Sequence, residues 1–337
     1  MITDSPEFRL LVHTLDDAYE IASVAFPREV NWKRFERLVQ NNKLALLAYS
    51  SVLHNGNLNV PPFWRARFSA VLEEQQAEHA KFAQSIDQVN RLLGSTPYVL
   101  VKTYRPFLYH THDVDVLVAD VDAVGKVATV AGIAWDDIPR GSVQIDEPQW
   151  LDLEFYPRVL PGSIQAIDDE LTLANPVRMT LAGVETWVAS PEVETVTLMA
   201  DAALRLYELK LGDMIYIYSL APRTDWALLE VQARKYGWIQ SFEEIAGVLN
   251  ALHQEVYGFE SPIERTISSR KPTTTVPYVP SWKATIRALS GLSNRHLLKL
   301  GGYLSVRLKI GHPRMHRVYV RFFQVPVGRF VLRYFYQ

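Results

Sequence analysis

The spacing of apolar residues changes twice along the chain, and this change limits the folds that are open to it. Residues 6–94 repeat apolar side chains at helical intervals. Residues 98–188 instead contain short apolar runs and period-two alternation, which indicate strands. The helical spacing returns from Pro191 onward. This order predicts an α+β protein in which a small sheet lies between two helical regions.

The same pattern predicts the individual elements. Residues 61–93 contain no glycine and predict one or two long helices, and Gly183 predicts a hairpin turn within residues 172–188. A single helix is expected to run from Pro191 toward Leu220, where a proline stops it. The other expected elements are helices at 31–39, 43–53, 124–134, 226–236 and 242–256, and strands at 98–101, 114–118 and 150–155.

The 337 residues are enough for two or three domains. We expect an N-terminal helical region at 1–95, a strand-rich core at 96–190 and a C-terminal helical region at 191–260. Residues 261–337 form a linker and a basic, aromatic extension. The Thr, Pro and Ser content of residues 268–281 indicates a flexible attachment of this extension.

The net charge of −2 hides a strong asymmetry between the body and the tail. Residues 262–337 contain 4 Lys and 10 Arg against a single acid, whereas the residues before them carry a net charge of −15. The tail also contains ten aromatic residues, and Arg314, Arg317 and Arg321 fall on one helical face. This composition suits RNA or another nucleic acid, an anionic membrane surface, or the acidic body of the same chain, and the sequence leaves all three open.

Several classes of protein are excluded by what the sequence lacks. There is no cysteine, so a disulfide scaffold, a thiolate metal site and a cysteine nucleophile are ruled out. No P-loop, dinucleotide-binding glycine motif or serine nucleophile elbow occurs. No run approaches the ~18–20 apolar residues of a membrane span, and the acidic N-terminus does not resemble a signal peptide. We therefore expect a cytoplasmic protein, or one attached peripherally to a membrane through its tail.

The residues best suited to chemistry are two aspartates at the start of an expected strand. Asp113 and Asp115 are two positions apart, so both side chains leave the same face of the strand. Carboxylates placed in this way can hold a pair of Mg²⁺ ions about 4 Å apart. Asp152 begins a later acidic strand and could complete a triad of oxygen ligands, with Glu154 projecting to the same side.

Acid-x-acid spacing alone is weak evidence, because 37 acids in 337 residues give about four such pairs by chance. We expect the other pairs to be solvated loop or helix-start charges. A zinc site at His110 and His112 is rejected, because the matching pattern needs an Asp and a His where the chain has Val114 and Asp115. The acid pairs set aside here are Asp120/Asp122, Asp168/Glu170 and Glu192/Glu194.

The order of several short motifs resembles the minimal nucleotidyltransferases of the DNA polymerase β-like superfamily, in the branch that includes abortive-infection toxin-type enzymes. The motifs that carry the resemblance are Val101-Lys102, Asp113-Val-Asp115-Val-Leu-Val, Asp152-Leu-Glu154, Leu209-Lys-Leu-Gly-Asp213 and the first helical segment from Asn31. The similarity covers about residues 1–255. It implies a small mixed-sheet nucleotidyltransferase core within the helical regions.

The resemblance also implies the activity and the roles of the site residues. A transferase of this kind moves NMP from an NTP such as ATP to an acceptor hydroxyl, for example on RNA or tRNA. Asp113, Asp115 and Asp152 would be the catalytic and metal-binding residues, with Asp113 and Asp115 bridging two Mg²⁺ ions. Asp152 would bind one ion and help to deprotonate the acceptor.

The chain departs from the superfamily at the first strand, where a glycine usually lets backbone N–H groups approach the triphosphate. Lys102 is followed by Thr103 here, and no glycine occurs between Gly94 and Gly125. We expect Lys102, Thr103 and Arg105 to contact phosphate instead, and the resemblance places Lys210 near the nucleotide.

This departure keeps two alternative functions open. One is a catalytically inactive binding protein that keeps the fold. The other is a membrane-surface enzyme with a lipid-linked or small-molecule acceptor.

Overall fold

The computed structural model describes residues 5–14, 29–55, 58–102, 105, 109, 111–138, 142–159, 165–202, 210–236, 238–257 and 261–263. Thr103, His110, the expected linker at 268–281 and almost all of the basic tail lie outside these residues.

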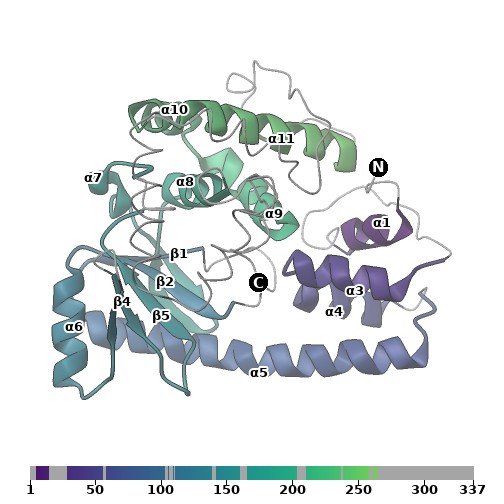
Figure 1. Cartoon of the computed structure of the whole chain (residues 1–337), viewed down its shortest axis with the longest axis horizontal. Helices are drawn as coiled ribbons and strands as arrows, with labels where there is room; N and C mark the ends of the chain where they lie inside the picture. Colours follow the sequence, from purple (N-terminus) through teal and green to yellow (C-terminus); the bar gives the residue numbers. More distant parts are fainter. Residues whose placement is uncertain are drawn as a thin grey trace, which may run out of the picture.

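A mixed sheet lies in the lower left of the view in Figure 1, between helices above and below it. Its order is β3-β4-β5-β2-β1-β7-β6, in a 7-stranded sheet. Strand β1 pairs antiparallel with β2 and parallel with β7, and β2 pairs parallel with β5. The strands are β1 Tyr98–Val101, β2 Asp113–Val118, β3 Asp136–Ile138, β4 Ser142–Ile145, β5 Asp152–Tyr156, β6 Val177–Leu181 and β7 Val184–Val188. The predicted α+β class is confirmed.

Helices cover the two faces of the sheet in different ways (Figure 1). The long helix α5, Pro62–Leu93, and the short helix α6, Val121–Val130, lie along one face. Helices α8, Pro191–Asp201, and α9, Leu211–Leu220, lie on the other side, near the end of β1. The remaining C-terminal elements are η4 Ala221–Arg223, α10 Trp226–Lys235 and α11 Ile239–Tyr257, and a short helix, α7, spans Asp169–Thr172.

The N-terminal helices α1 Pro6–His13, α3 Trp32–Asn41 and α4 Ala45–His54 lie beside the part of α5 that extends past the sheet (Figure 1). Aromatic side chains fill this contact. Tyr49 stacks on Phe68 with ring centroids 4.2 Å apart, and Phe35 packs edge-on against Phe68. Aromatic pairs of this kind add to the stabilisation from burial alone.

Local sequence signals set the helix starts. The side chains of five N-cap residues accept backbone N–H groups of the first turn, as is typical of Ser, Asn and Asp at this position. Proline in the first turn of α1, α5 and α8 also favours a helix start, because the N–H groups of a first turn have no partner within the helix and proline has no N–H. The five caps are Ser5, Asn31, Asp120, Ser190 and Asp225.

The structure differs from the sequence prediction in several places. The single helix expected from Pro191 to Leu220 is two helices, because α8 ends at Asp201 and Lys210 has extended backbone before α9. Strands β3 and β4 were not predicted. Helix α6 spans Val121–Val130 and not the expected 124–134, and Asp120 caps its start.

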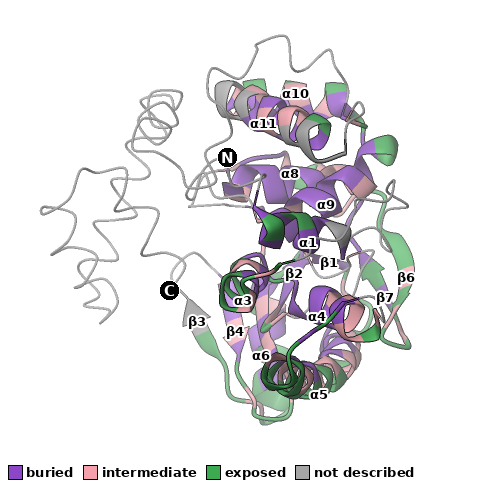
Figure 2. Ribbon diagram, turned by 90° about the vertical axis from the view of Figure 1, so that its right-hand side faces the viewer, coloured by how far each residue is buried: buried purple, intermediate pink, exposed green. Residues whose placement is uncertain are grey.

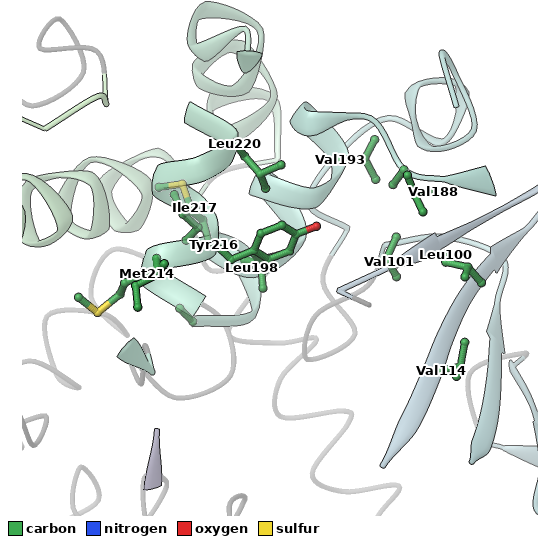
Figure 3. Close-up of a cluster of buried hydrophobic side chains, with 14 of the residues drawn as sticks. Leu100, Val101, Val114, Val188, Val193, Leu198, Met214, Tyr216, Ile217 and Leu220 are labelled. Carbon is green, nitrogen blue, oxygen red and sulfur yellow. The ribbon is translucent and has the colours of Figure 1, made fainter. Parts of the chain in front are cut away.

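The core runs through the sheet and into the C-terminal helices. Figure 2 shows that α8 and α9 are among the most buried elements, and every residue from Val193 to Ala200 is buried. Figure 3 shows Ile217 and Leu220 of α9 on the same side as Leu198 of α8, while Val193 of α8 lies nearer to Val188 and to Val101 of β1. Helix α8 therefore contacts both α9 and β1.

Candidate active site

Four acidic side chains lie together on one face of strands β2 and β5. The parallel register pairs Asp113 with Asp152 and Asp115 with Glu154. Residues that pair directly across two strands project to the same side of the sheet. The structure thus brings the three predicted catalytic aspartates to one surface.

The opposite face of the same strands is fully apolar. Val114, Val116, Leu153 and Phe155 are buried against the core. This burial fixes the register, because a shift of one residue would move the carboxylates into the core. The alternation of the two strands therefore places the acids on the face away from this core, where Asp113, Asp152 and Glu154 are half-buried and Asp115 is buried.

Charge is concentrated where Asp113 and Asp152 meet. Burial raises the pKa of Asp152, and the carboxylates of Asp146 and Asp113 raise it further, while His112 lowers it. Asp113 is held by Thr111, whose hydroxyl donates to its Oδ1 at 2.9 Å. Crowded carboxylates of this kind favour a bound cation or a shared proton.

Asp115 has a different environment. Only 6% of its surface is exposed, and its Oδ2 lies 2.8 Å from Nζ of Lys102. Burial raises the pKa of Asp115, whereas the Lys102 ammonium lowers it. Lys102 Nζ also lies 4.0 Å from Oδ2 of Asp201, at the end of α8.

The backbone of Lys102 is fixed by a buried glutamate, Glu194, which was expected to be solvated. The Lys102 N–H donates to both carboxylate oxygens of Glu194, at 2.9 and 3.0 Å. Glu194 is wholly buried, and burial raises its pKa to about 8. The expectation of a solvated charge at Glu194 is wrong, because helix α8 is covered all round. The sequence signal of this burial is the apolar residues that flank Glu194, such as Val193 and Val196.

Two of the other expected surface acids also have structural roles. Asp168 accepts hydrogen bonds from Tyr236, Gln232 and the ammonium of Lys235, which lower its pKa to about 2. The Glu192 carboxylate accepts the N–H of Asp225 at 3.0 Å. Both acids connect α10 to the rest of the fold.

Arg105 lies away from solvent, although it was expected to contact phosphate. Its side chain is 3% exposed, and its Nη2 donates to Oδ1 of Asp213 at 2.6 Å. Its guanidinium stacks on Tyr109, 3.8 Å from the ring centroid. This geometry joins Arg105 to α9 through Asp213, while the Nε and Nη1 atoms of Arg105 are buried without a hydrogen-bond partner. A phosphate contact by Arg105 stays a prediction.

Of the two other residues expected to contact the nucleotide, the structure describes only Lys210. Lys210 is half-buried at the position just before α9, and Thr103 lies outside the described residues. Asp213, which shares the helical motif with Lys210, pairs with Arg105.

The donor set suits one hard cation better than two. Asp113 and Asp152 offer carboxylate oxygens from paired positions of β2 and β5, and carboxylate oxygens are ligands that Mg²⁺ prefers. Asp115 already has an ammonium at ion-pair distance. Across the described ranges, no group of three or more His, Cys, Asp or Glu side chains is arranged to hold a metal ion.

A comparison with models of protein families identifies the family to which the chain belongs. Residues 28–254 match the model of a family described as an uncharacterised nucleotidyltransferase. The chain belongs to this nucleotidyltransferase family. The match includes Lys102, all four acids of β2 and β5, and Glu194, and it ends before the basic tail. No curated protein and no solved structure matches this chain. In the part of the chain that the structure describes, none of the helices combines the length and apolar character needed to cross a bilayer.

Proposed function

We propose that the protein transfers NMP from an NTP to an acceptor hydroxyl, with Asp113, Asp115 and Asp152 as its catalytic residues. The acceptor oxygen would attack the α-phosphorus, the bond to the β-phosphate would break, and pyrophosphate would leave. One observation carries the proposal: in a member of a nucleotidyltransferase family, the parallel register of β2 and β5 sets these carboxylates side by side on a partly exposed face. Nucleotidyl transfer needs negative oxygen ligands beside the attacking hydroxyl, and this face supplies them.

Asp113 and Asp152 are the residues that would hold Mg²⁺. When bound there, the ion would neutralise charge on the transferred phosphoryl group. Asp152 is also placed to accept the proton of the acceptor hydroxyl, because it lies directly opposite Asp113 on the same face of the sheet.

The nucleotide is expected to lie between this acidic face and the start of α9, where Lys210 would contact it. Arg105 supports this arrangement from inside the protein by pairing with Asp213 in the first turn of α9. The acceptor hydroxyl that best suits the composition belongs to RNA, because the tail after the core is strongly basic and rich in aromatic residues.

The proposal is tested by incubating the full chain with each α-³²P-labelled NTP, Mg²⁺ and total cellular RNA, beside a lane without RNA. We expect label on RNA with the wild-type protein and none with Asp113→Asn. The matched control is Asp122→Asn, since Asp122 belongs to a second acid-x-acid pair but is exposed in the first turn of α6.

A second candidate is a catalytically inactive protein that binds nucleotide without transferring it. The contact of the Lys102 ammonium with Asp115 favours it, because a ligand position of the acidic face is already filled. This candidate predicts NTP binding that Asp113→Asn weakens, with no label on any acceptor. No NTP binding at all would contradict both candidates.

A further inference from the structure

Lys102 adopts a backbone conformation that a lysine rarely takes. Its φ is +59°, at the end of β1. The left-handed region costs a residue with a side chain roughly 1–2 kcal/mol relative to a right-handed one. Specific contacts of Lys102 must therefore offset this cost.

The first of these contacts fixes the backbone. Glu194 receives the Lys102 N–H on both carboxylate oxygens and is itself immobilised within α8, whose cap residue Ser190 and first turn are also buried or half-buried. A buried, doubly engaged acceptor holds the N–H in one direction, and this direction determines where the side chain of Lys102 leaves the chain.

The second contact fixes the charge. The ammonium lies 2.8 Å from Asp115 and 4.0 Å from Asp201, with only a quarter of the Lys102 side chain exposed. A pair that is this poorly solvated is screened little by salt. A divalent ion on Asp115 would have to displace the ammonium or lie beside a like charge.

From these contacts we propose that Lys102 is a fixed cation at Asp115, held there by Glu194, and that it takes the place of one of the two divalent ions. The enzyme would then bind a single divalent ion, at Asp113 and Asp152. The inference rests on the proposed function for its meaning in catalysis. The claim itself concerns only which cation neutralises Asp115.

The test counts bound metal and needs no activity. The full chain is titrated with Mn²⁺ alone, and free Mn²⁺ is followed by its electron paramagnetic resonance signal. We expect Lys102→Met to bind one ion more per chain than the wild type, and Lys102→Arg, which keeps the charge, to bind the wild-type number. Lys126→Met is the control for loss of a lysine, because Lys126 is exposed on α6.

Equal Mn²⁺ counts in the wild type and Lys102→Met would overturn the inference. If Lys102→Met does not fold, as judged by circular dichroism, Lys102→Gly gives the same comparison, since glycine tolerates the left-handed backbone. The proposed function is judged separately, by the wild-type count alone. A wild type that binds no Mn²⁺ contradicts the site at Asp113 and Asp152, whether or not Lys102→Met gains an ion.

Discussion

Arg105→Met distinguishes a structural arginine from a phosphate-binding one. The guanidinium is buried, pairs with Asp213 at 2.6 Å and stacks on Tyr109. Methionine keeps the apolar stem but leaves the Asp213 carboxylate, itself 22% exposed, without this partner. Breaking a buried ion pair costs about 3–5 kcal/mol. Because Asp213 keeps some access to water, we expect a loss near the lower value, about 3 kcal/mol.

The assay is urea-induced unfolding at pH 7, followed by circular dichroism. Arg158→Met is the matched control, since the Arg158–Asp169 pair is 3.5 Å long with side chains 44% and 45% exposed. Exposed pairs of this kind contribute about 0–1 kcal/mol. In the double variant Arg105→Met/Asp213→Asn we expect part of the lost stability to return, because no unpaired charge is left buried.

The reasoning would be refuted by an Arg105→Met protein with wild-type stability and weakened NTP binding. That combination would mean that the guanidinium faces the nucleotide and not Asp213.

Three further predictions concern single ionisable residues. The pKa of Glu194 is raised from 4.5 to about 8, so the folded state keeps a proton that the unfolded state loses. The free energy of unfolding should therefore fall as the pH rises from 5 to 8. Glu194→Gln should flatten this pH dependence in urea unfolding. The pKa of Asp168 is lowered from 3.8 to about 2, so its contribution, about 1–2 kcal/mol at pH 7, should disappear as the pH falls from 4.5 toward 2; Asp168→Asn should lack this acid-dependent loss in thermal unfolding. Lys102→Gly should be about 1 kcal/mol more stable than Lys102→Ala, because only alanine keeps the strain of the left-handed backbone; equal unfolding midpoints would contradict this.

Features encoded in short stretches of sequence were predicted well. The apolar run Tyr98–Val101 is β1, and the hairpin around Gly183 joins β6 and β7, with Ala182 and Gly183 both at positive φ. The start of α8 at Pro191 and the end of α9 at Leu220 are also as expected. Local periodicity, caps and turn residues determine these elements, so one sequence is enough to find them.

Features that depend on distant contacts were not predicted. The three-residue strand β3 is too short to show alternation, and it forms because it pairs with β4. Glu194 and Arg105 carry the same side chains as solvated residues elsewhere, and their burial comes with partners far away in the sequence, Lys102 for Glu194 and Asp213 for Arg105. The sequence placed Asp152 on a strand like that of Asp113, whereas the direct pairing of the two comes from the parallel register of β2 and β5.

If the acidic face of β2 and β5 carries out nucleotidyl transfer, the reaction must depend on Asp113. The most direct test measures the initial rate of α-³²P label transfer to RNA by two variants, Asp113→Asn and the control Asp122→Asn, under the same conditions. We expect Asp113→Asn to be at least about 100-fold slower than Asp122→Asn, because it lacks a catalytic carboxylate. Both variants should keep the wild-type unfolding midpoint. Transfer at equal rates by the two variants would contradict the account, because the reaction would then not depend on this face.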